Sequence, residues 1–71
     1  MTKKYWMGTV SSLDDFGRPI TNTFYDSKTV MGPWATMAPL SWFDHGVGKL
    51  GMGYGQKYEK QNDGRWLKVE G

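Results

Sequence analysis

Aromatic rings are the main apolar material of this chain, and its length limits how many of them a fold can bury. The 71 residues include four Trp, four Tyr and three Phe, and no Cys. A domain of this size buries only about 60% of the surface that its unfolded chain exposes. Some rings must therefore stay at the surface, where aromatic side chains often mark a binding face.

Glycine and proline restrict the fold class. Ten Gly and three Pro are spread along the chain, which disfavours long helices and favours short strands joined by turns. The apolar share of 38% is typical of a globular chain rather than a disordered one. We therefore expect a single small domain over residues 1–71, of the α+β class and mainly β. The expected architecture is an antiparallel curved sheet of four or five short strands, with a small β-barrel as the alternative.

The clearest single element is a β-hairpin at the C-terminal end. Its strands cover residues 56–61 and 65–69, separated by the turn-forming residues Asn-Asp-Gly. Other runs rich in aromatic and β-branched residues predict further strands earlier in the chain. These are Lys4 to Ser11, Ile20 to Tyr25 and Lys28 to Met31, with residues 34–37 as another extended piece.

Two geometries are open for the turn of this hairpin. A two-residue turn that ends at Gly64 pairs Tyr58 with Val69 and sets opposite charges against each other on the next pair. A three-residue loop with Gly64 as a bulge pairs Lys60 with Trp66 instead. We favour the first geometry, and both require a positive φ at Gly64.

One short helix is predicted near residues 39–45. Pro39 suits a first helical position, and Gly46 suits the position after the last one. A helix of about two turns has no stability of its own in water, so packing must hold it. We expect Trp42 and Phe43 to provide that packing.

Motifs with catalytic or cofactor chemistry are weak in this chain. The run Gly46–Gly51 matches the letters G-x-G-x-x-G, but a dinucleotide site needs a strand before it and a helix after it. Here a predicted helix precedes the run. The glycines of the run instead suit a backbone that passes close under a tryptophan. Ser41, Asp44 and His45 lie together on one short helix and cannot converge on a substrate as a triad does. We expect no catalytic, cofactor or metal site, and hence no enzyme.

The predicted hairpin interleaves cations with rings. Residues 49–71 carry five basic and three acidic groups, so the net charge of +2 lies in the last third of the chain. Such a surface binds single-stranded nucleic acid or forms the centre of a protein interface, and its rings can equally pack over a small core. Two further tryptophans are candidates, one in the predicted helix and one before it. The candidate partner-binding residues are therefore Trp34, Trp42, Lys57, Tyr58, Lys60, Arg65, Trp66 and Lys68.

Assembly and location follow from what the sequence lacks. A domain this small usually needs a disulfide, a metal or a second chain for stability, and without Cys we expect a homodimer or a monomer held by a partner. No apolar run is long enough to cross a bilayer, and the N-terminal residues do not form a signal sequence. We expect a cytoplasmic protein with no membrane contact.

Five short segments carry a resemblance to a known group of proteins. They are Gly32–Ala35, Ser41–Trp42, Gly46–Gly48, Gly55–Tyr58 and Asp63–Val69. With these segments, residues 14–71 resemble small orphan proteins encoded by tailed bacteriophages and prophages. The resemblance implies a viral origin and a place in the host cytoplasm or the virion. The expected function is therefore to bind, and inhibit, a host protein through exposed aromatic residues. The alternatives are a small nucleic-acid-binding module and a minor structural component of the virion.

Overall fold

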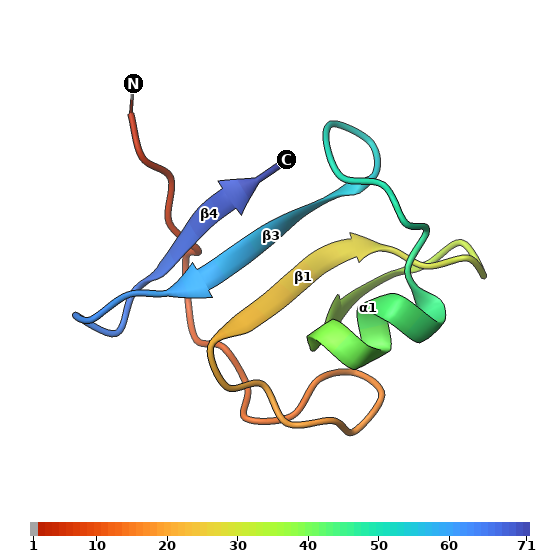
Figure 1. Ribbon diagram of the computed structural model, residues 1–71, viewed down its shortest axis with the longest axis horizontal. Helices are drawn as coiled ribbons and strands as arrows, with labels where there is room; N and C mark the ends of the chain where they lie inside the picture. The colour runs from red at the N-terminus through yellow and green to blue at the C-terminus, as the bar shows by residue number, and fades with distance from the viewer. Residues whose placement is uncertain (1) are drawn as a thin grey trace.

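The computed structural model describes residues 2–71 and consists of one antiparallel sheet with one helix (Figure 1). The sheet has four strands in the order β2-β1-β3-β4. The strands are β1 (Thr23–Lys28), β2 (Trp34–Met37), β3 (Gly55–Lys60) and β4 (Trp66–Glu70), and the helix is α1 (Pro39–His45). The mainly β, α+β prediction is confirmed. The barrel alternative is wrong, because β2 and β4 lie at opposite edges of an open sheet.

The two faces of the sheet are covered differently, and β1 shows both. Phe24 is fully buried and meets the rings of Trp6 at 5.3 Å, Tyr58 at 5.1 Å and Trp66 at 5.1 Å. Its neighbour Tyr25 points to the other face, because side chains alternate along a strand. We call the side of Phe24 the N-terminal face, because the segment that contains Trp6 covers it.

The opposite side is the helix face, since α1 packs there against β1 and β2. Tyr25 stacks on Trp42 of α1, with ring centroids 4.7 Å apart and planes 8° from parallel. Met37 pairs with Tyr25 across the strands and is fully buried. Figure 1 shows α1 in front of the sheet and the N-terminal segment passing behind it.

The predicted strand from Lys4 to Ser11 is wrong. Only Tyr5 pairs, with Leu67 of β4. The N–H of Trp6 donates to the carbonyl of Trp66 (2.9 Å), and the N–H of Lys68 donates to the carbonyl of Lys4 (2.8 Å). Beyond Trp6 the chain leaves the edge of the sheet and crosses the N-terminal face, because the ring of Trp6 packs there on Phe24.

Two further strand boundaries differ from expectation. The strand predicted over residues 20–25 is observed as β1, three residues later. The strand predicted over residues 28–31 does not form. Lys28 is the last residue of β1, and the N–H of Gly32 donates to the carbonyl of Thr29 (3.0 Å) and closes a turn. The extended piece over residues 34–37 is confirmed as β2.

The hairpin formed by β3 and β4 has the three-residue loop rather than the two-residue turn. Lys60 pairs with Trp66 and Tyr58 with Lys68, so the favoured two-residue turn is wrong and the three-residue alternative is right. The N–H of Gln61 donates to the carbonyl of Arg65 (2.7 Å), which closes the loop. Asp63 stabilises this geometry, because its carboxylate accepts the N–H (2.9 Å) and the Nε–H (2.8 Å) of Arg65.

Gly64 gives the first testable prediction. Its φ is +87°, in the region that side chains with a Cβ avoid. We expect Gly64→Val to lower the free energy of unfolding by about 2 kcal/mol, because a β-branched residue resists this conformation. Urea unfolding followed by tryptophan fluorescence measures the loss. Gly64→Asn is the control, since Asn adopts a positive φ more readily, and an equal loss in both variants would contradict the backbone explanation.

The predicted helix bounds are confirmed, with Pro39 in the first turn. Gly46 has an ordinary extended φ of −73°, and its importance is steric: a Cβ there would collide with the ring of Trp42. Trp42 packs as expected, but the prediction for Phe43 is wrong, since Phe43 is 84% exposed. At 3.6 residues per turn, Ser41, Trp42 and His45 share the inward side, which leaves Phe43 outside.

Both edges of the sheet are protected against further strand pairing. At β2, the N–H of Asp15 donates to the carbonyl of Thr36 (3.1 Å), and the Asp15 carboxylate accepts the N–H of Thr36 (2.8 Å). At β4, Tyr5 and its neighbours cover one half, and the register shifts by one residue in the other half, beside Val69. Bulges and covering segments of this kind prevent edge-to-edge pairing. The backbone groups at these positions are therefore not free to pair with a further strand.

Candidate functional site

Two of the predicted partner-binding rings belong to the core. Tyr58 and Trp66 are half-buried and pack against Phe24 on the N-terminal face. Tyr58 also meets Trp6, with ring centroids 5.3 Å apart. Burial raises the pKa of the Tyr58 hydroxyl, and the charge of Asp26 raises it further. These two rings hold the hairpin on the sheet.

The four cations predicted on the hairpin fall into two groups. Lys57 lies on the helix face, between the carboxylates of Glu59 (3.8 Å) and Glu70 (4.0 Å). Arg65 is paired with Asp63 in the loop and lies 4.1 Å from the centroid of the Tyr5 ring. The second group, Lys60 and Lys68, lies on the N-terminal face and forms no ion pair within residues 2–71.

The remaining predicted residues, Trp34 and Trp42, lie on different elements. Trp42 is half-buried in its stack on Tyr25. Trp34 begins β2 opposite Lys28 and is 46% exposed. The structure therefore does not bring the eight predicted residues together into one site, and Trp34 is the more accessible of these two rings.

An apolar surface that the sequence did not predict lies on the outer side of α1. Leu40 and Phe43, one turn apart, are 67% and 84% exposed. Exposed apolar side chains from two loops lie around the C-terminal end of the helix. We call the five residues the helix patch: Phe16, Val30, Met31, Leu40 and Phe43.

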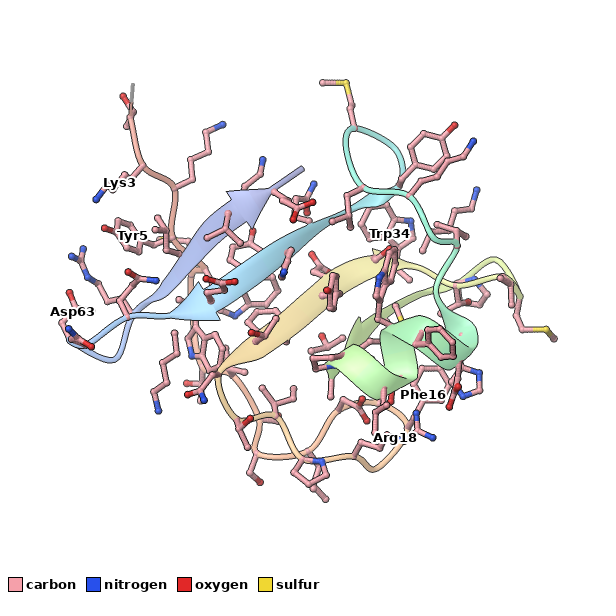
Figure 2. The ribbon with its side chains drawn as sticks, in the orientation of Figure 1. Lys3, Tyr5, Phe16, Arg18, Trp34 and Asp63 are labelled. Atoms are coloured by element: carbon pink, nitrogen blue, oxygen red, sulfur yellow. The ribbon has the colours of Figure 1, made fainter. Side chains whose placement is uncertain are left out.

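His45 connects the parts of the helix patch. The Phe16 ring stacks on the His45 ring at 4.1 Å, with the planes 10° from parallel. The carbonyl of His45 accepts the N–H of Val30 (2.8 Å), which joins the turn after β1 to the helix. Figure 2 shows Phe16 beside the lower side of α1. The signal that could have found this patch is the spacing of Leu40 and Phe43, once Ser41 and Trp42 are known to face inward.

A polar network fixes the loop that carries Phe16 to the helix. Arg18 forms an ion pair with Asp44 (2.7 Å) and donates to the Ser41 hydroxyl (3.4 Å). The buried carboxylate of Asp14 accepts the N–H of Ala38, just before α1, at 2.8 Å. Burial alone would raise the pKa of Asp14, but the Ser41 hydroxyl and the backbone N–H groups that it accepts outweigh burial and lower that pKa. The loop that carries Phe16 is therefore fixed against α1.

Ser41 shares α1 with Asp44 and His45, the residue types of a catalytic triad. The structure places it at 0% exposure, where its hydroxyl serves the network around Asp14 and Arg18. His45 is stacked on Phe16 at the other end of the helix. The structure therefore gives both residues packing and hydrogen-bonding roles.

Comparison of the chain with protein-family models, with curated proteins and with solved structures finds no match. Across residues 2–71, no helix combines the length and apolar character needed to cross a bilayer.

Proposed function

We propose that this chain is a non-enzymatic interaction protein that docks on another protein through the helix patch. The observation that carries the proposal is the exposure of Leu40 and Phe43 on a helix whose other side is already packed. Isolated exposed apolar residues are common, whereas neighbouring ones, such as Leu40 and Phe43 on one side of a helix, favour an interaction site.

The surroundings of the helix patch resemble the anatomy of a protein interface. An apolar centre is bordered by the Arg18–Asp44 ion pair and by His45, which supply a polar rim. Met31 adds an unbranched, polarisable side chain, which adapts to the shape of a partner. The network around Asp14 fixes the loop that carries Phe16 in advance, which lowers the entropy lost on binding.

The resemblance to phage-encoded proteins indicates the kind of partner. For a phage-encoded inhibitor, the partner is a host protein in the cytoplasm. For a minor virion component, the partner is another protein of the particle. The helix patch suits both kinds of partner, because an apolar surface with a polar rim can bind a host protein or a virion protein equally well.

Removal of the apolar side chains tests the proposal. We expect Leu40→Ser combined with Phe43→Ser to weaken partner binding at least tenfold, since large buried apolar side chains dominate interface energies. The measurement is recovery of one discrete protein from a host extract, followed by its titration against the purified chain. The matched control is Met52→Ser, which changes an exposed apolar residue in the loop before β3.

Two results would contradict the proposal. One is a double variant that keeps the circular dichroism of the parent and also keeps its affinity. The other is a homodimer formed through the same patch, seen as a melting temperature that rises with protein concentration in the parent but not in the double variant.

A further inference from the structure

A second surface lies on the N-terminal face of the sheet. The acidic side chains of the hairpin strands lie on the opposite face. Glu59 and Glu70 are on the helix face with Lys57, which pairs with both. Asp63 is in the loop and is held by Arg65. The N-terminal face of the hairpin therefore presents lysines, and no carboxylate of the described hairpin lies among them.

The N-terminal segment adds a third lysine to this face. The pairing of Tyr5 with Leu67 sets Lys4 opposite Lys68, on the side where Trp6 and Trp66 meet Phe24. Lys60 is on the same face, diagonal to Lys68 across β3 and β4. We call Lys4, Lys68 and Lys60 the lysine row.

The lysine row carries an unfavourable interaction that an anion would relieve. Like charges directly opposite on neighbouring strands destabilise a sheet, and Lys4 lies directly opposite Lys68. None of the three lysines forms an ion pair within residues 2–71. Diagonal neighbours such as Lys68 and Lys60 are about 7–8 Å apart, a separation that successive phosphates of an extended strand can match.

A polar groove continues the row beyond Lys60. It is bounded by Lys60, Gly64 and Trp66 on one side and by the segment that crosses the sheet on the other. Four hydroxyl side chains line it, and none of its lining residues is acidic: Thr9, Ser11, Ser12 and Thr21. Hydroxyl groups and ammonium groups are both donors to phosphate oxygen.

We propose that the lysine row and this groove bind single-stranded nucleic acid through its phosphates. The row offers cations at strand spacing, and the groove beside Lys60 offers hydroxyl donors. Bases contribute little, because Trp66 is packed on Phe24 and has the Lys60 ammonium 6.0 Å from its ring centroid. Binding therefore depends strongly on salt and little on base sequence.

This surface is separate from the helix patch. Lys3, Tyr5 and Asp63 lie toward one end of the molecule, whereas Phe16 and Arg18 lie toward the other (Figure 2). The two proposals can therefore fail independently. The helix-patch double variant should bind nucleic acid like the parent.

Fluorescence anisotropy with a labelled oligothymidine tests the proposal. Three neutralised phosphates predict that the logarithm of the association constant falls with the logarithm of salt concentration with a slope of about −2. Lys60→Gln and Lys68→Gln should each make the slope shallower by about 0.7. Lys57→Gln is the matched control, because Lys57 is on the helix face and already paired. It should leave the slope unchanged.

Three results would overturn the proposal. The first is the absence of binding at about 50 mM salt, where phosphate contacts are strong. The second is a loss in Lys57→Gln as large as that in Lys60→Gln. The third is equal binding of polyglutamate, which would assign the surface to acidic protein instead. A rise in the melting temperature of Lys68→Gln would show that the variant remains folded and that the pair with Lys4 was unfavourable.

Discussion

Phe24→Ala should remove a large part of the stability of this domain. Phe24 is 0% exposed and lies among three other rings, so its removal leaves a cavity that the small domain cannot refill. Truncation of a buried Phe costs about 3–5 kcal/mol. The whole stability of a chain of 71 residues is about 4–10 kcal/mol. Urea unfolding followed by circular dichroism should show a midpoint at a much lower denaturant concentration than that of the parent.

Phe43→Ala is the matched control for this prediction. It removes the same side chain from a position that is 84% exposed, and surface substitutions of this kind change stability by about 0.5 kcal/mol or less. The two variants together test the arrangement of the rings. Equal losses at the two positions would show that the Phe24 cluster is not the centre of the core.

The elements that the sequence predicted well depend on local signals. Pro39 can begin a helix but cannot sit in its interior, and this restriction fixed the start of α1 at the right residue. Gly64 permits a positive φ, which located the hairpin turn. Such signals act within a few residues and need no knowledge of the rest of the fold.

The parts that were predicted wrongly depend on contacts between distant segments. Residues after Trp6 look like a strand, but they cross the sheet because Trp6 packs on Phe24, eighteen positions further along the chain. Phe43 looks like the anchor of α1, but Ser41 takes the inward position because Asp14 and Arg18 bind it there. Sequence periodicity does not reveal contacts of this range.

The length of the hairpin loop determines the β3–β4 register, and the register determines which side chains form the lysine row. The favoured two-residue turn would have set Glu59 opposite Lys68 and neutralised both. The observed loop sets Glu59 opposite Leu67 and Lys68 opposite Tyr58, which leaves Lys68 without a carboxylate. A register shift of one residue moves side chains to the other face of a strand. The lysine row could therefore not be predicted from the sequence without the register.

Asp14→Asn should give the second largest loss of stability. The Asp14 carboxylate is buried and accepts three backbone N–H groups: those of Phe16 (2.9 Å), Arg18 (2.8 Å) and Ala38 (2.8 Å). An Asn amide removes the charge and cannot accept from Ala38 with its nitrogen. We expect a cost of about 3 kcal/mol at pH 7, because hydrogen bonds to a charged group are strong and a buried N–H is left unpaired.

The same residue predicts how stability depends on pH. The pKa of Asp14 is lower in the folded chain than in the unfolded one, so the unfolded chain binds its proton first as the pH falls. The stabilisation is therefore complete above the unfolded pKa and is lost as the pH falls through the folded pKa. Thermal melts of the parent between about pH 5 and pH 2 should show this loss, and Asp14→Asn should flatten the curve.

Asp26→Asn should have the opposite effect and tests the explanation. Burial raises the pKa of Asp26, and the charge of Asp15 raises it further, so the ionised side chain opposes folding at neutral pH. A raised folded pKa contributes stability at low pH that is lost as the pH rises through it. We therefore expect Asp26→Asn to melt at a higher temperature than the parent at pH 7, with the advantage vanishing in acid. The explanation would be wrong if both substitutions changed the melting temperature in the same direction at pH 7. Hydrogen bonding at Asp14 and burial at Asp26 would then not determine how the two ionised carboxylates affect stability.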